Sequence, residues 1–281
     1  MNKCLAFLAL FLIPAYASAW EQTMTCGDTA PCPEGQSPLP TAWKSPCVAF
    51  HLNQNGTSHM SFLDVTNTVK TSIQTWNRPA LSSLTPHFSG NTDEDRIGYN
   101  PYFPANNANI IVFRDENWQE SRAIMALTTV THHISTGQIF DADIEINTTN
   151  YKYGIVEKDG SHVVDLQNTL THEIGHVFGF AHSSVQDATM FPYSGTGETN
   201  LRSLAQDDLS ALVAIYPPDK NISCTFDDQF YKRPWYEMDY MPPAQYESCS
   251  ASPLSSRTPA PFFIAFFLFP LIYSYRKQHH E

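Results

Sequence analysis

Apolar side chains recur every three or four residues in several stretches of the chain, which is the spacing of one face of an α-helix. Phe62–Trp76 shows this pattern and predicts an amphipathic helix. Leu166–Phe178 and Ala205–Tyr216 are predicted as further helices. Pro217 and Pro218 end the last one, because proline lacks the backbone N–H that a helix uses.

Shorter stretches predict β-strands. Cys47–Leu52, Ile110–Phe113 and Ala123–Val130 are short and mainly apolar, as buried strands are. In Gln138–Asn147 apolar and polar residues alternate, which favours a strand with one solvated face. The pattern therefore predicts a mixed domain of strands and helices.

One predicted helix carries a concentrated group of metal-binding residues. The chain reads H-E-x-x-H-x-x-G-x-x-H from His172 to His182. His172 and His176 are four residues apart, so a helix places both imidazoles on one face. Gly179 can adopt a positive φ and turn the chain back, which brings in His182 as a third ligand. Three neutral imidazoles with one open position describe a catalytic zinc site rather than a structural one.

Glu173 directly follows the first histidine and points away from the ligand face. Zinc lowers the pKa of a bound water to about 7. The carboxylate can take the proton of that water and pass it to a leaving amine. The alternative is an ordinary helix with scattered histidines, which would not need five specified residues at fixed spacing.

The motif resembles that of the metzincin peptidases, and its flanks resemble the matrixin branch, the peptidase M10 relatives of matrix metalloproteinases. Metzincins place a methionine turn beneath the zinc, and Met190 stands eight residues after the third histidine. Ser183 and the sequence LAQDDL over Leu204–Leu209 are also similar to matrixins. The resemblance is strongest over Val164–Pro217 and weaker back to Trp43.

This resemblance implies an α+β fold of the metzincin type: a twisted, mostly parallel sheet on two long helices, with a small subdomain after the zinc helix. It implies a zinc endopeptidase acting on proteins or peptides, with Met190 packed under the metal. Pro192 and Tyr193 would form the wall of the substrate side-chain pocket, although matrixins separate these two residues by one position. Asp207 and Asp208 would anchor the floor of the domain, or serve as favourable charges at a helix N-terminus.

The alternating strand Gln138–Asn147 also gains a role from the resemblance. It would be the sheet edge above the active-site cleft, where a substrate peptide pairs as an added strand. Its acidic residues offer hard oxygen ligands for calcium, or else form a solvated strand face. These residues are Asp141, Asp143 and Glu145.

Length and charge limit the partners. The 281 residues, 42% of them hydrophobic, suffice for one domain with extensions. A formal net charge of −12 argues against binding nucleic acid or anionic lipid. We expect a monomer with its metallopeptidase domain over 43–218, an irregular extension over 20–42 and a loop-rich appendix over 219–259.

Both ends carry targeting signals. Met1–Ala19 has a lysine, an apolar run too short for a membrane helix and the small-residue cleavage site Ala17-Ser18-Ala19, so it predicts a secretory signal. In 260–281, the apolar stretch Pro261–Tyr275 precedes Arg276-Lys277, which predicts a membrane tether or a sorting tail. A buried terminal helix is the alternative. We therefore expect a secreted or cell-surface protein with its catalytic domain outside the cell.

Export makes disulfides permissible. The chain has six cysteines, and loss of Cys4 with the signal would leave five. Cys224 and Cys249 bracket the C-terminal segment and are the predicted pair. The segment at Cys26 loosely resembles the inhibitory cysteine segment of matrixin pro-domains, in which a thiolate caps the zinc, but a disulfide is the favoured expectation.

Two other functions are compatible with parts of the sequence. One is a surface-anchored binding or adhesion module with a vestigial zinc site, although such a module would have no use for Glu173 beside all three ligands. The other is an enzyme that trims one specific partner rather than digesting proteins broadly.

Overall fold

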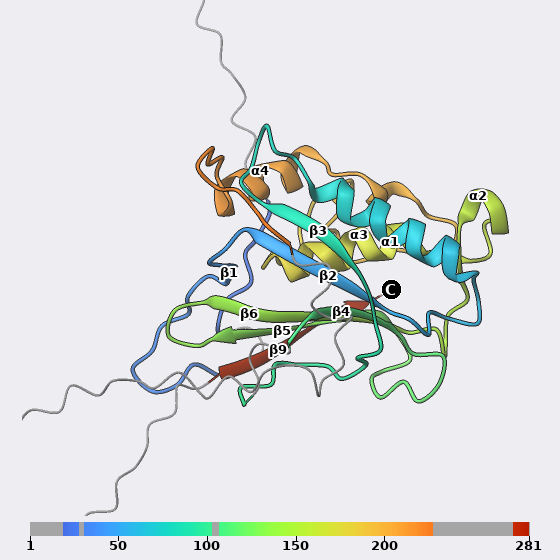
Figure 1. Cartoon of the computed structure of the whole chain (residues 1–281), viewed down its shortest axis with the longest axis horizontal. Coiled ribbons are helices and arrows are strands. Elements are labelled where there is room, and N and C mark those ends of the chain that lie inside the picture. The colour runs from blue at the N-terminus through green and yellow to red at the C-terminus, as the bar shows by residue number, and fades with distance from the viewer. Residues whose placement is uncertain (1–18, 28–30, 103–106, 227–271, 281) are drawn as a thin grey trace, which may run out of the picture.

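The computed structural model describes residues 19–27, 31–102, 107–226 and 272–280, which form a twisted sheet with helices on one side (Figure 1). The strands are β1 (Ala42–Trp43), β2 (Cys47–Asn53), β3 (Thr85–Thr92), β4 (Asn109–Phe113), β5 (Ile124–His133), β6 (Gln138–Ile146), β7 (Tyr153–Gly154), β8 (Val164–Asp165) and β9 (Ile272–His280). The helices are α1 (Phe62–Trp76), α2 (Val156–Asp159), α3 (Leu166–Val177), the short 3-10 helix η2 (Asn200–Arg202) and α4 (Gln206–Ile215).

The main sheet has seven strands among the described residues, in the order β3-β2-β4-β6-β5-β9, with β1 pairing to β6. β1, β2, β3, β4 and β6 pair in parallel, whereas β5 runs antiparallel to β6 and to β9. The expected mixed fold with a mostly parallel sheet is therefore confirmed.

The position of one strand differs from the expectation. β6, the alternating strand predicted at the sheet edge, is an inner strand between β4 and β5. Its polar face is covered because the chain between β3 and β4 folds over it: the backbone N–H of Gly98 donates to Asp143 over 2.7 Å. The alternation of residue types indicated a solvated face, but it carried no information about this cover.

α1 and α3 lie on the same face of the sheet and pack against each other (Figure 1). The side chain of Ser61 caps α1 by accepting the N–H of Asp64 over 3.1 Å. At the other end of α1 the indole N–H of Trp76 donates to the carbonyl of Thr171 in α3 over 2.8 Å. This contact fixes the two helices side by side in the buried core.

α3 contains threonines, which have low helix propensity. Packing compensates, because every residue of the helix except Gln167 is buried. Thr171 donates its hydroxyl to the carbonyl of Gln167 over 2.7 Å, so its polar group is satisfied within the helix. The zinc-motif helix is thus held by its surroundings rather than by its own propensity.

Two disulfides fix the chain, and they revise the predicted pairing. Cys26 bonds Cys32, so the cysteine of the suspected inhibitory segment has no free thiol. Cys47 bonds Cys224, which makes the predicted Cys224–Cys249 pair wrong. Closeness in sequence suggested that pair, whereas the fold brings the chain after α4 to the start of β2. Cys249 lies outside the described residues.

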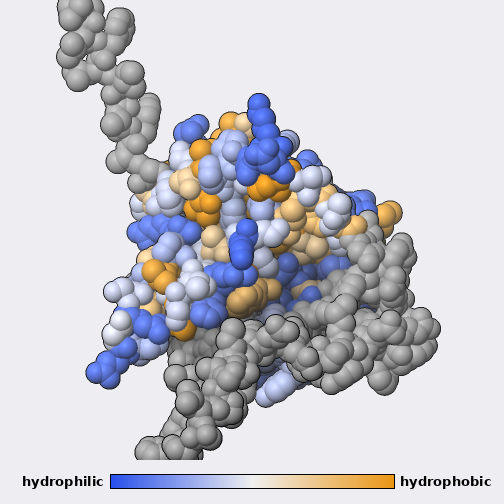
Figure 2. Space-filling view, turned by 60° about the vertical axis from the view of Figure 1, so that its left-hand side comes forward, coloured by the Kyte–Doolittle hydropathy of each residue, from blue (hydrophilic) through white to orange (hydrophobic). Residues whose placement is uncertain are grey.

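The segment predicted as a tether lies largely outside the described residues, and its last residues, Ile272–Tyr275, belong to β9. The described residues include no helix that is both long and apolar enough to cross a membrane. Over the visible face of the described part, polar and apolar residues are interspersed, as is usual for a folded domain in water (Figure 2).

Candidate metal centre

The three motif histidines converge. His172 and His176 project from α3, and His182 follows the turn after it. The Nε2 atom of His176 lies 3.1 Å from Nε2 of His172 and 3.2 Å from Nε2 of His182. Among the described residues this is the one group of three or more His, Cys, Asp or Glu side chains arranged to hold a metal ion.

The outward ring nitrogens determine which tautomer two of the histidines adopt. Nδ1 of His172 lies 2.7 Å from the carbonyl oxygen of Thr189, and Nδ1 of His176 lies 2.7 Å from that of Phe180. Because a carbonyl only accepts, each Nδ1 carries the proton and each Nε2 presents a lone pair. Two lone pairs 3.1 Å apart repel unless a cation lies between them. Tetrahedral zinc with bonds of about 2.0–2.1 Å suits this donor set.

A glycine turn brings in the third histidine. α3 ends at Val177, and Gly179 has a φ of +88°. A Cβ at Gly179 would lie 2.3 Å from the carbonyl oxygen of Thr41, so only glycine fits. The N-terminal extension holds the returning chain in place: the N–H of Ala181 donates to the carbonyl of Glu21 over 2.9 Å. The N-terminal extension is thus part of the support of the site.

Met190 is buried directly against α3. A Cβ at Gly175 would lie only 2.2 Å from the Met190 sulfur, so the thioether fills the space that glycine leaves. The carboxylate of Asp208 supports this turn by accepting the N–H groups of Thr189 over 2.8 Å and of Met190 over 3.1 Å. The tight fit at Gly175 was not anticipated, although the glycine stands inside the motif.

Asp207 holds two segments together. Its carboxylate accepts the hydroxyl of Ser183 over 2.7 Å and the backbone N–H groups of Ala19 and Trp20 over 2.8 and 3.2 Å. Both acidic residues of α4 thus bind other parts of the domain, as an anchoring role would require.

Glu173 lies next to the first ligand and is fully buried. Its Oε2 atom accepts the hydroxyl of Thr128 on β5 over 2.6 Å. Oε1 is buried and has no hydrogen-bond partner among the residues that the structure describes. Burial raises the pKa of Glu173 to about 8, and the Thr128 hydrogen bond partly opposes this rise. Thr128 was not identified in the sequence, where it is one of several threonines in an apolar stretch.

The three acidic residues of β6 do not form the expected solvated face. Asp141 and Asp143 are buried, and Asp143 accepts the N–H groups of Gly98 and Ile110. Burial raises the pKa of both carboxyl groups, and for Asp141 the neighbouring Asp143 adds to the rise. Glu145 instead pairs with Arg114 over 2.8 Å. The arrangement gives no support to calcium binding.

The expected pocket wall follows the methionine turn. Tyr193 is 52% exposed, and its ring meets that of Phe191 edge-on, with the centroids 5.7 Å apart. Pro192 between them is partly buried. Their contact with a substrate stays a prediction.

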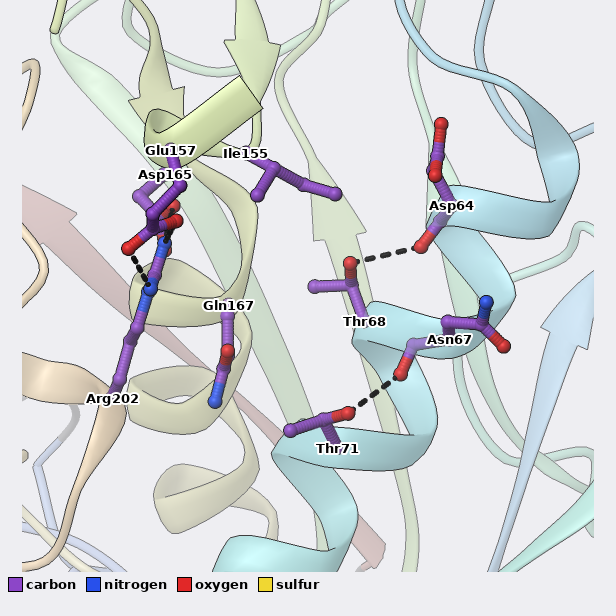
Figure 3. A pocket seen from close by; sticks show the side chains of 9 residues that line it. All are labelled: Asp64, Asn67, Thr68, Thr71, Ile155, Glu157, Asp165, Gln167 and Arg202. Carbon is purple, nitrogen blue, oxygen red and sulfur yellow. Dashed lines mark hydrogen bonds and ion pairs between the residues drawn. The ribbon is translucent and has the colours of Figure 1, made fainter. Parts of the chain in front are cut away.

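A cavity of about 300 Å³ lies between α1 and the start of α3, and it contains none of the three histidines (Figure 3). It is lined by Asp64, Asn67, Thr68, Thr71, Ile155, Glu157, Asp165, Gln167 and Arg202. We place the reactive site at the histidines, because the cavity has no comparable set of metal donors.

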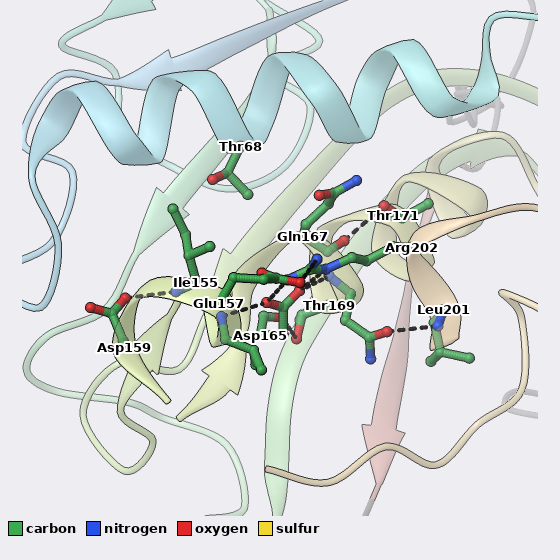
Figure 4. A network of polar contacts seen from close by, with 12 residues as sticks. Thr68, Ile155, Glu157, Asp159, Asp165, Gln167, Thr169, Thr171, Leu201 and Arg202 are labelled. Atoms are coloured by element: carbon green, nitrogen blue, oxygen red, sulfur yellow. Dashed lines mark hydrogen bonds and ion pairs between the residues drawn. The ribbon is translucent and has the colours of Figure 1, made fainter. Parts of the chain in front are cut away.

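The cavity wall instead contributes to the support of α3 (Figure 4). Asp165 caps α3 by accepting the N–H of Asn168 over 2.9 Å. Arg202 donates from Nε to the same carboxylate over 2.7 Å and from two further nitrogens to Glu157. The side-chain oxygen of Asn168 accepts the N–H of Leu201 over 2.7 Å. This network ties the start of the zinc-motif helix to the chain after the methionine turn.

Comparison with known proteins agrees with this geometry. The family model described as matrixin, peptidase M10, matches residues 42–217, more than half of the 281 residues. Metalloendoproteinase 5-MMP of Arabidopsis thaliana is 44% identical over 59 residues, 21% of this chain and 16% of the relative. Human matrilysin is 36% identical over 64 residues, 22% of this chain and 24% of the relative. Human neutrophil collagenase is 46% identical over 50 residues, 18% of this chain and 11% of the relative. The chain thus covers only a minor part of each of these relatives.

Proposed function

The chain belongs to the matrixin family, and from this premise we propose that it is a zinc-dependent metalloendopeptidase that hydrolyses peptide bonds in extracellular proteins. The observation that carries the proposal is the convergence of three imidazole nitrogens beside a buried carboxylate. A binding module with a vestigial site would need neither the buried carboxylate nor its hydrogen bond to β5.

In this proposal His172, His176 and His182 hold one zinc ion through their Nε2 atoms. Zinc, when bound, supplies an acidified water and stabilises the negative charge that develops on the scissile carbonyl. Thr189 and Phe180 keep two of the ligands in the correct tautomer through their carbonyls.

The proton transfers fall to Glu173. The unpartnered Oε1 takes the proton from the water that attacks the peptide carbonyl, and then gives it to the departing amine. The burial of the side chain excludes bulk water from around the carboxylate. Met190 packs beneath the ligands and is not itself a ligand.

The ligand assignment is tested by metal content. His182→Ala should lose both bound zinc and peptide cleavage, whereas His162→Ala, in an exposed loop, should keep both. Zinc is measured by elemental analysis of the purified proteins, and cleavage with a peptide library. Full stoichiometric zinc in the His182→Ala protein would show that three histidines are not required.

We also propose that the protein is exported and held at the cell surface. The signal-like start and the two disulfides support export, because disulfides persist mainly in oxidising compartments. The apolar residues 261–271 support retention by a tether, whereas Ile272–Lys277 belong to β9, which pairs with β5. Fractionation of expressing cells decides this point: truncation before Ser252 should release active enzyme into the medium. Full-length protein wholly soluble in the medium, with its C-terminal peptide attached, would contradict the tether.

A further inference from the structure

Thr128 is a polar residue on an apolar face. It lies in the middle of β5, on the side that faces α3, together with the buried Ala126 and Val130. A hydroxyl buried among apolar side chains is costly unless it forms a hydrogen bond. Valine has nearly the same shape as threonine and would fill this position without that cost. The presence of a hydroxyl at this position therefore indicates a role other than packing.

The partner of the hydroxyl is the carboxylate of Glu173. Thr128 Oγ1 lies 2.6 Å from Oε2 of Glu173 and 3.2 Å from the backbone oxygen of the same residue. A hydroxyl has one proton, and the shorter distance assigns it to the carboxylate. Hydrogen bonds of this length to a charged oxygen are among the stronger ones in proteins.

The sheet holds the Thr128 hydroxyl in place. In the β5–β6 ladder Thr128 pairs with Ile144, and its neighbours pair with Asp143 and Glu145. Threonine is branched at Cβ, so few χ1 rotamers are available to it. The donor on β5 is therefore rigid, whereas the glutamate on α3 has three rotatable side-chain bonds.

We propose that Thr128 is a positioning residue for the general base: it holds Oε2 of Glu173 and thereby keeps Oε1 directed toward the reacting water. The inference rests on the proposed function. It concerns the orientation of the carboxylate and not the binding of zinc, because the Thr128 hydroxyl is directed at Glu173.

The test compares Thr128→Val with Thr128→Ser. The valine variant should lower kcat by about 10–100-fold, the usual cost of losing an orienting partner. Its KM and zinc content should stay within about 2-fold of the parent, because binding of substrate and metal is untouched. The serine variant keeps the hydroxyl and should recover kcat to within about 3-fold of the parent.

Thr129→Val is the matched control. Thr129 is the next residue on β5 and is also buried, and its hydroxyl has no hydrogen-bond partner within the described part of the chain, so its loss should leave kcat within about 2-fold. The contact between Thr128 and Glu173 can also be tested without zinc, by a double-mutant cycle on the metal-free protein. The unfolding midpoints of Thr128→Val, Glu173→Gln and the double variant should be non-additive, because the two side chains touch.

An unchanged kcat in Thr128→Val, or a serine variant as slow as the valine variant, would overturn the inference. If the valine variant does not fold, Thr128→Ala provides the same comparison. Failure of the proposed function can be distinguished from failure of this inference alone. A Glu173→Gln enzyme as active as the parent overturns the function and this inference together, whereas an inactive Glu173→Gln with a fully active Thr128→Val overturns this inference alone.

Discussion

Gly175 lies within the zinc motif, between the two helical histidines, and Met190 fills the place of its missing side chain. A Cβ at this position would lie 2.2 Å from the Met190 sulfur and 2.8 Å from the Trp76 ring. The glycine costs α3 some intrinsic stability, because glycine is a poor helix former. Because Gly175 has no side chain, the methionine turn lies directly against the helix that carries His172 and His176.

Gly175→Ala should therefore destabilise the domain, even though alanine favours helices. We expect a loss of about 1–3 kcal/mol in the free energy of unfolding, the usual cost of overpacking a core. Gly195→Ala is the control, because a Cβ there would have its nearest neighbour at 3.8 Å. Chemical denaturation of both variants measures the difference. Equal stability of parent and Gly175→Ala would mean that the turn does not pack as described.

The carboxyl pair Asp141–Asp143 predicts a dependence of stability on pH. Burial raises the pKa of both groups above the unfolded value of about 3.9, so the folded state binds more protons than the unfolded state. Stability contributed by the pair is then full below about pH 4 and declines as the pH rises toward the raised pKa values.

Asp141→Asn keeps the shape of the side chain and removes its titration. The stability of the variant relative to the parent should rise by at least about 1 kcal/mol between pH 5 and pH 8, because folding of the parent then requires Asp141 to take up a proton that the unfolded chain has lost, whereas asparagine binds none. Asp187→Asn, in an exposed loop, should follow the parent at both pH values. Denaturation curves at the two pH values give the comparison. A relative stability that does not rise between the two pH values would show that the pair is not a destabilising charge cluster.

At the scale of elements, the spacing of apolar residues predicts correctly the features that depend on neighbouring residues in the sequence. Phe62–Trp76 was predicted from periodicity and is α1 with the same ends. β3 was not predicted, because its sequence TPHFSGNT lacks both alternation and apolar density. The position of β6 inside the sheet could not be inferred from its own residues, since it depends on β5 and on the loop that covers its polar face.

The disulfide Cys47–Cys224 joins the start of β2 to the chain after α4, across 177 residues of sequence. Cys47→Ser should lower the free energy of unfolding by about 2–5 kcal/mol, as the loss of a native disulfide usually does. Peptide mapping under non-reducing conditions identifies the bond directly, and recovery of a Cys224–Cys249 peptide would contradict it.

At the scale of the whole molecule, the site combines one local segment with several distant ones. The three histidines and Glu173 lie within eleven consecutive residues, so a sequence motif was sufficient to find them. Their supports come from elsewhere: β5, the N-terminal extension, the methionine turn and α4. Thr128 is separated from Glu173 by 45 residues, and which strand lies beside α3 follows only from the fold.

The central claim is that Glu173 transfers protons at a zinc site built from His172, His176 and His182. The most direct measurement is the cleavage rate of a peptide library by Glu173→Gln, with zinc content and unfolding midpoint determined on the same protein. Glu116→Gln, an exposed glutamate, is the control. The account predicts a folded Glu173→Gln protein with one zinc and at least ~100-fold slower cleavage, the usual size of a general acid–base contribution. Cleavage by Glu173→Gln at the rate of the parent, with zinc bound, would contradict the account.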